Sequence, residues 1–190
     1  MIDETARVLA VSVASVRSVP WHDGVVQTGI YKAPTDRRVL VRRDGLEGDE
    51  QADLQSHGGP LKAVYLYPSE HYAFWEGELP GTPLPWGAFG ENLTVSRLSE
   101  KDVHVGDRFQ IGSAVLAATR PRFPCYKLGI RFGRPDIVDR FLASGRTGFY
   151  LRVLEEGEVG NGDLVRRLGG GEGQPTIADL VDARRRDTEG

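Results

Sequence analysis

Residues 103–119 read VHVGDRFQIGSAVLAAT, and this stretch decides the class of fold. It holds three short runs rich in apolar residues, VHV, RFQI and AVLAAT, which are separated by Gly106-Asp107 and Gly112-Ser113. Glycine next to a small polar residue is typical of a tight turn. The pattern therefore predicts short strands that pair with one another through turns.

Runs of the same kind continue on both sides of this stretch. Valine-rich or alternating segments bounded by turn residues occur at 7–17, 38–43, 62–67, 148–154 and 158–168. We expect the last two to form a closing hairpin. Many short strands separated by glycine turns favour a mainly β fold, either a barrel or a sandwich.

Three segments have helical patterns, and the last of them follows a glycine-rich stretch. Residues 69–78 follow Pro68 and open with a serine, a common residue at a helix N-terminus. Residues 135–143 begin with proline and carry apolar residues on one face. Residues 176–186 start with a Thr-x-x-Asp capping pattern. We expect a β-barrel domain over 1–168 and a glycine-rich linker with a short C-terminal helix over 169–190.

Composition excludes several classes of protein. The chain has 190 residues, a formal net charge of −3 and 39% hydrophobic residues, which suits one domain that can bury a core. The mildly acidic total argues against general nucleic-acid binding. The N-terminus has no basic region before an apolar run, and no stretch approaches the ~20 apolar residues of a membrane span, so we expect a cytoplasmic protein without a membrane partner.

The single cysteine, Cys125, lies in an unusually basic segment. One cysteine per chain excludes an intramolecular disulfide, a Cys-based zinc knuckle and a four-thiolate iron–sulfur cluster. Residues 120–134 (RPRFPCYKLGIRFGR) contain five cations and no acid. Such surroundings favour a thiolate, and guanidinium groups bind phosphate or carboxylate. The segment is therefore suited to a metal whose organic carrier bears a phosphate, although an inert buried cysteine remains an alternative.

The densest polar cluster is residues 45–62, GLEGDEQADLQSHGGPLK. His57 beside two glycines could act as an acid or base near neutral pH, with Asp49 or Asp53 setting its tautomer. A solvated loop of turns is the alternative. A divalent-metal hydrolase using Asp49, Asp53 and His57 is a further hypothesis, although their spacing matches no standard ligand pattern. The usual dinucleotide, P-loop, zincin and serine-hydrolase motifs do not occur.

Read together, these segments resemble the MOSC domain family, the module related to the C-terminal domain of molybdenum-cofactor sulfurases, and most of all its YiiM-type branch. The resemblance covers about residues 5–168 and depends on an ordered set of motifs. These are GLEGDEQAD (45–53), HGGPLKAV (57–64), Tyr67, Trp75, FGENL (89–93), VGD (105–107), PRFPCYK (121–127) and TGFY (147–150).

The resemblance implies a MOSC-type β-barrel with a few short helices that binds molybdenum cofactor, molybdopterin with molybdenum. In this family the cysteine is taken as the molybdenum ligand, which is Cys125 here. Basic residues hold the anionic phosphopterin, and the matching candidates in this sequence are Arg122, Lys62 and Lys127, with Arg120 and Lys32 behind them.

The resemblance also implies an activity, because YiiM-like proteins reduce N-hydroxylated compounds from N–OH to N–H. By analogy Cys125, Asp53 and His57 form the catalytic set, in which Asp53 and His57 supply protons or orient the leaving oxygen. Asn92 would contact the cofactor or the substrate. The reaction consumes two electrons, and the chain has no flavin or nicotinamide motif, so we expect an external flavin or iron–sulfur reductase as electron donor.

Two questions stay open at this level. A non-catalytic module that carries molybdenum cofactor or sulfur to another enzyme would bind the same cofactor. Longer YiiM-type relatives carry several helices after the barrel, whereas 169–190 leaves room for a linker and one helix. The oligomeric state, including a homodimer, and the range of substrates therefore remain undetermined.

Overall fold

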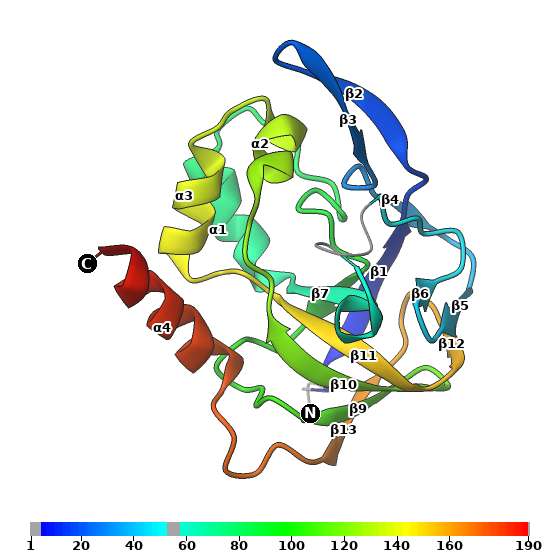
Figure 1. The fold of residues 1–190 in the computed structure, drawn as a ribbon. Coiled ribbons are helices and arrows are strands. Elements are labelled where there is room, and N and C mark those ends of the chain that lie inside the picture. Colours follow the sequence, from blue (N-terminus) through cyan, green and yellow to red (C-terminus); the bar gives the residue numbers. More distant parts are fainter. Residues whose placement is uncertain (1–4, 53–57, 190) are drawn as a thin grey trace.

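A large mixed sheet and four short α-helices make up the computed structural model, which describes residues 5–52 and 58–189. The large sheet has eight strands in the order β13-β9-β10-β11-β7-β8-β1-β4 (Figure 1). In chain order these strands are β1 (Arg7–Val13), β4 (Ala33–Thr35), β7 (Val64–Pro68), β8 (Leu93–Ser96), β9 (Arg108–Ile111), β10 (Ala114–Pro121), β11 (Phe149–Glu155) and β13 (Val165–Gly169). The mainly β class expected from the sequence is confirmed.

The stretch that predicted the fold forms a hairpin, as expected. Ile111 of β9 pairs with Ala114 of β10, and Gly112 makes the turn with φ +60. A side chain at Gly112 would place its Cβ 2.1 Å from the carbonyl oxygen of Glu158, so only glycine fits there. The VHV run is not a strand: His104 makes only an isolated bridge to Thr176.

The large sheet curls toward a barrel. Backbone hydrogen bonds run from Val8 N–H to Asp163 C=O at 2.9 Å and from Val165 N–H to Ala6 C=O at 2.8 Å. They join the start of β1 to the chain leading into β13, from opposite parts of the strand order. These bonds do not form a continuous ladder, so the curled sheet is barrel-like without complete closure.

Two smaller sheets extend this framework. One has the order β12-β5-β6, and the other is the β2–β3 hairpin, which projects from the molecule in Figure 1. Their strands are β2 (Arg17–Trp21), β3 (Gly24–Thr28), β5 (Val39–Arg42), β6 (Gly45–Leu46) and β12 (Gly157–Val159).

The closing hairpin predicted for 148–154 and 158–168 is wrong. Strands do form there, but β11 pairs with β10 and β7, β12 pairs with β5, and β13 pairs with β9. Alternation of apolar and polar residues predicts that a segment forms a strand. It does not predict the neighbouring strand, which depends on how the whole fold buries the apolar face.

The three predicted helices are present as α1 (Glu70–Glu78), α3 (Ile137–Ser144) and α4 (Ile177–Glu189). The capping pattern before α4 is confirmed, since Asp179 N–H donates to Thr176 Oγ1 at 3.0 Å and Thr176 N–H donates to Asp179 Oδ2 at 2.9 Å. Ser69 precedes α1 but makes no side-chain cap. None of the described helices is long and apolar enough to cross a membrane.

One further α-helix and a short 3₁₀ helix were not predicted. The α-helix is α2 (Tyr126–Phe132), and the 3₁₀ turn is η1 (Pro60–Lys62). Leu128 and Phe132 lie four residues apart, and Gly133 ends the helix in the left-handed conformation with φ +65. This spacing followed by glycine is a helix signal that the charge of the segment obscured.

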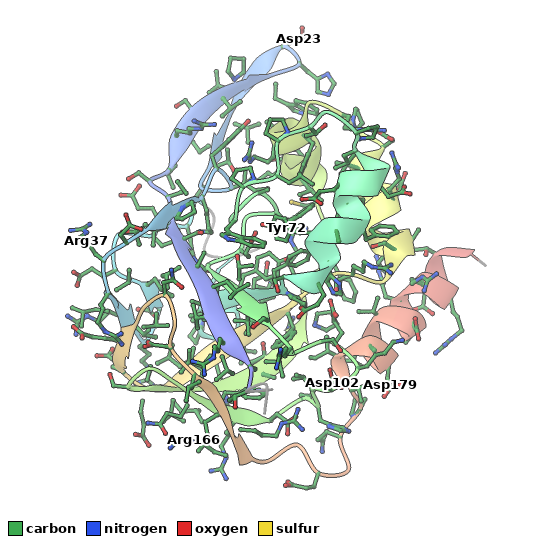
Figure 2. All side chains as sticks on the ribbon, turned by 180° about the vertical axis from the view of Figure 1, so that it is seen from behind. Asp23, Arg37, Tyr72, Asp102, Arg166 and Asp179 are labelled. Carbon is green, nitrogen blue, oxygen red and sulfur yellow. The ribbon has the colours of Figure 1, made fainter. Side chains whose placement is uncertain are left out.

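Two hydrophobic cores support this arrangement. The first lies within the curled sheet and includes Ile177 of α4. The second is aromatic and lies where α1, α2 and α3 gather beside the sheet (Figure 1); it contains Tyr67, Tyr72 and Trp75. Figure 2 shows Tyr72 in the interior and Asp23 at the periphery.

Candidate functional site

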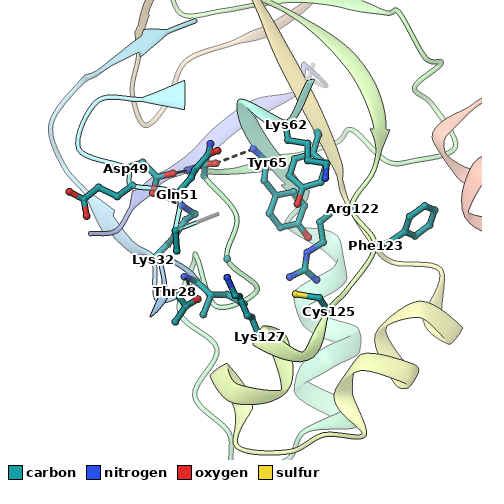
Figure 3. A pocket seen from close by; sticks show the side chains of 17 residues that line it. Thr28, Lys32, Asp49, Gln51, Lys62, Tyr65, Arg122, Phe123, Cys125 and Lys127 are labelled. Carbon is teal, nitrogen blue, oxygen red and sulfur yellow. Dashed lines mark hydrogen bonds and ion pairs between the residues drawn. The ribbon is translucent and has the colours of Figure 1, made fainter. Parts of the chain in front are cut away.

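One pocket collects side chains from distant parts of the chain (Figure 3). It lies where the loops after β3 and β6, the start of β7 and the segment between β10 and α2 meet. Its polar and reactive lining residues are Thr28, Lys32, Asp49, Glu50, Gln51, Lys62, Tyr65, Asn92, Arg122, Cys125, Lys127 and Tyr150.

Arg122 is the most deeply buried cation of the pocket. It directly follows β10, and its backbone N–H donates to Gly148 C=O at 3.2 Å. The residue is only 6% exposed, and its guanidinium carbon lies 5.4 Å from the ring centre of Tyr65 and 5.1 Å from that of Phe141. The buried Nη1 atom makes no hydrogen bond to any described residue. A buried polar group without a partner is costly, so Nη1 is a donor that a ligand can satisfy.

Arg122 stays charged despite its burial. Burial opposes the charge, yet the neighbouring Tyr65, Tyr150 and Cys125 together hold the pKa of Arg122 above its ordinary value. Burial also raises the pKa of Tyr150, which Arg122 partly offsets. The pocket therefore presents a guanidinium and a neutral phenol side by side at physiological pH.

Cys125 and Lys127 lie on the same wall as Arg122. Cys125 is half-buried, occupies the position before the first residue of α2 and has an extended backbone with φ −132 and ψ 174. In Figure 3 its sulfur lies beside the Arg122 guanidinium, and the Lys127 and Lys62 side chains extend into the same space. We call Arg122, Cys125 and Lys127 the cationic wall.

The opposite wall is held together by its own hydrogen bonds. The Asp49 carboxylate, 2% exposed, pairs with Lys32 Nζ and accepts hydrogen bonds from Ala14 N–H at 2.9 Å and Asn92 Nδ2 at 2.9 Å. Asn92 Oδ1 accepts the Tyr65 N–H at 3.0 Å. We call Lys32, Asp49 and Asn92 the bonded wall.

The bonded wall contributes little net charge to the pocket. Burial lowers the pKa of Lys32, although Asp49 and, more weakly, Glu91 act in the opposite direction. Both oxygens of Asp49 already accept hydrogen bonds from within the chain. Because lysine and aspartate neutralise each other, the positive field of the pocket comes from its other cations.

Seven of the candidate residues named from the sequence meet in this pocket: Lys32, Asp49, Lys62, Asn92, Arg122, Cys125 and Lys127. Arg120 is exposed and does not line the pocket; it lines a second cavity. Asp53 and His57 lie outside the described residues.

Tyr65 and Tyr150 line the pocket and were not predicted as site residues. Tyr65 packs against Tyr150 with ring centres 5.4 Å apart, and its hydroxyl donates to Thr147 C=O at 2.7 Å. Tyr150 belongs to the TGFY motif, which was a signal for its place in the site. Tyr65 lies in a uniformly apolar run, where nothing in the sequence separates a pocket tyrosine from a core one.

The divalent-metal hypothesis required Asp49 as a ligand, and the structure does not leave this carboxylate available. The carboxylate of Asp49 is occupied by Lys32, Ala14 and Asn92. Within 5–52 and 58–189, no cluster of His, Cys, Asp or Glu is arranged to hold a metal ion. The solvated-loop alternative does not describe Asp49 either, because its side chain is buried.

Comparison with known proteins places this fold and pocket in a class. The family pattern of the MOSC domain matches residues 53–166. The chain therefore belongs to the MOSC domain family, a domain associated with the molybdenum cofactor.

Comparison with individual relatives shows which branch of the MOSC family the chain belongs to. The chain is 45% identical to the uncharacterized protein YflK of Bacillus subtilis, over 90% of this chain and 77% of that protein. The crystal structure of YiiM from Geobacillus stearothermophilus has a TM-score of 0.80 and 31% identity, covering 97% of this chain and 86% of that one. A protein named Reductase from Gibberella moniliformis is 38% identical over 76% of this chain, which spans only 26% of that protein. The chain lies in the YiiM-type branch.

Proposed function

We propose that this protein is a molybdenum-cofactor-binding oxidoreductase that reduces N-hydroxylated compounds. The observation that carries the proposal is the cationic wall: a thiol next to a buried guanidinium whose Nη1 has no partner among the described residues. A relative named Reductase supports the class of reaction.

The residues present fit such a cofactor. A soft thiolate is a suitable ligand for molybdenum, and Cys125 is the only cysteine of the chain. Arg122, Lys127 and Lys62 surround it with positive charge suited to an anionic phosphopterin. Lys32 lines the pocket but is paired with Asp49, so we assign it a supporting role.

When bound, the cofactor would supply a metal that exchanges two electrons, which matches the chemistry of the substrate. Conversion of R–NHOH to R–NH₂ and water consumes two electrons and two protons. The chain's own residues would hold the cofactor, and Arg122 would donate a hydrogen bond from Nη1 to an anionic oxygen. The electrons would come from an external flavin or iron–sulfur reductase.

The deciding experiment measures metal content and turnover together. The protein is produced in a host with active molybdenum-cofactor synthesis and analysed for molybdenum and pterin. It is then assayed with an amidoxime or a hydroxylaminopurine and an artificial electron donor. We expect stoichiometric molybdenum, turnover to the N–H product, and loss of molybdenum in Cys125→Ser.

A matched control uses the next residue. Tyr126→Phe alters an exposed side chain that does not line the pocket and should leave metal and turnover unchanged. Molybdenum content unaffected by Cys125→Ser would refute the proposed ligation. A metal-loaded protein that turns over no N-hydroxylated compound would identify the carrier alternative instead.

A further inference from the structure

A second cavity lies beside the first, between the end of β10 and α4. Its apolar lining includes Val105, Pro121, Leu180 and Ala183. Phe123 lines both cavities and is 41% exposed. Figure 3 shows its ring directed away from Arg122 and Cys125. The two cavities are therefore neighbours that share one aromatic side chain.

The second cavity is also positively charged. Arg120 reaches it from β10 and Arg184 from α4, against one carboxylate, Asp187. Among the described side chains neither arginine forms an ion pair, unlike the exposed Arg134, which pairs with Asp136. Two guanidinium groups against one carboxylate favour an anion, which they can bind through paired N–H donors.

The uncharged polar residues that line this cavity do not offset this preference. The Thr119 hydroxyl donates to Leu61 C=O at 2.6 Å and lies 3.1 Å from Tyr150 C=O, so it is engaged within the chain. Gln174 lines the cavity with a neutral amide. A ligand in this cavity would meet an exposed aromatic ring, aliphatic side chains and two cations.

The residue shared by the two cavities lies close to the thiol along the chain. Phe123 is two residues from Cys125, and two residues of extended chain span at most about 7 Å. An aromatic ring substituted at opposite ends has a comparable length. A substrate with its reactive end at the thiol would extend past Phe123 toward the side of the second cavity that Arg120 and Arg184 line.

We infer that this second cavity binds the body of the substrate, and that the preferred substrates are N-hydroxylated compounds with an aromatic body and an anionic group at the far end. The inference rests on the proposed function and assigns its substrate class. Phe123 provides the stacking surface, and Arg120 and Arg184 select the anionic group.

The test compares two substrates that differ only in the far group, benzamidoxime and 4-carboxybenzamidoxime. With the cofactor-loaded full chain we expect a KM about threefold to fivefold lower for the carboxylate, the size of a partly exposed ion pair, with similar kcat. The double variant Arg120→Gln/Arg184→Gln should abolish this preference, so that the two substrates have equal KM values. Arg186→Gln, an exposed arginine of α4 outside the cavity, should retain it. Phe123→Ala should weaken both substrates.

Calorimetry without an electron donor measures the same preference as a difference in Kd. If the double variant keeps the preference for the carboxylate, or wild type shows none, the inference is overturned while turnover of benzamidoxime still supports the proposed function. If neither compound is reduced but the carboxylate binds with the same dependence on both arginines, the cavity assignment stands and the proposed function fails.

Discussion

The two walls of the pocket differ in how their charges are satisfied. In the bonded wall, Lys32 and Asp49 face each other, and Asn92 links the carboxylate to the backbone of Tyr65. In the cationic wall, Arg122 is as buried as those residues, yet its Nη1 has no partner in the described part of the chain. The wall that pairs its own charges stabilises the fold, and the wall that leaves a buried donor unpaired is prepared for a ligand.

This comparison has a direct energetic consequence. Removing one partner of a buried ion pair leaves the other charge without compensation, which is strongly destabilising. Arg122 has no carboxylate partner among the described residues, and its charge is supported mainly by the neighbouring aromatic rings of Tyr65 and Phe141. Replacing it with an apolar side chain of similar length therefore leaves no opposite charge buried without compensation. Neutral substitutions should therefore destabilise the bonded wall much more than the cationic wall.

The largest expected effect is on the bonded wall. Asp49→Asn keeps the shape of the side chain but leaves the buried Lys32 ammonium without its carboxylate. We expect the free energy of unfolding to fall by about 3–5 kcal/mol, measured by urea denaturation. The double variant Lys32→Met/Asp49→Asn should recover part of this loss. A double variant no more stable than Asp49→Asn would show that the pair is not the source of the stability.

The next effect is on the cationic wall and should appear in binding. Arg122→Met removes the donor that we assign to the cofactor, so its affinity should fall about 10- to 100-fold, the value of a hydrogen bond to a charged group. Cofactor retained after gel filtration measures this loss. The free energy of unfolding should change by less than about 1 kcal/mol.

Arg134→Met is the matched control for Arg122. Arg134 belongs to the same basic segment but pairs with Asp136 at 2.5 Å, away from the pocket. We expect normal cofactor content in this variant. Equal loss of cofactor in both variants would mean that the overall charge of the segment, and not the buried guanidinium, retains the ligand.

The smallest effect is a pH dependence of stability. Burial lowers the folded-state pKa of Lys32 below 10.5, so the unfolded chain binds more protons at this site between the two values. The contribution of Lys32 to the free energy of unfolding should therefore rise as pH increases toward 10.5. The difference between wild type and Lys32→Met, measured over a pH series, isolates this contribution. A difference that falls with increasing pH would contradict the lowered pKa.

Parts of the fold could be predicted from the sequence because they depend on residues close together in the chain. The turn glycines around β9 and β10 predicted that hairpin, and the Thr176–Asp179 pattern predicted the start of α4. The strands that pair with β11 could not be predicted, because the apolar and polar residues of Phe149–Glu155 alternate in the same way whichever strand lies beside them. The helix after Cys125 was missed because its apolar positions are interrupted by two cations, of which Lys127 lines the pocket and Arg131 lies over the Tyr31 ring.

The sequence by itself determined the mainly β class, the basic surroundings of Cys125 and an ordered set of motifs that resembles the MOSC family. Each depends on residues close together in the chain or on their order along it. Only the tertiary structure decided which cations share the pocket and which are already neutralised. The sequence does not distinguish Lys32 from Lys127. In the structure Lys32 is paired with the buried carboxylate of Asp49 from another segment, whereas Lys127 lies on the cationic wall. Such pairing depends on contacts between distant segments, which exist only once the chain has folded.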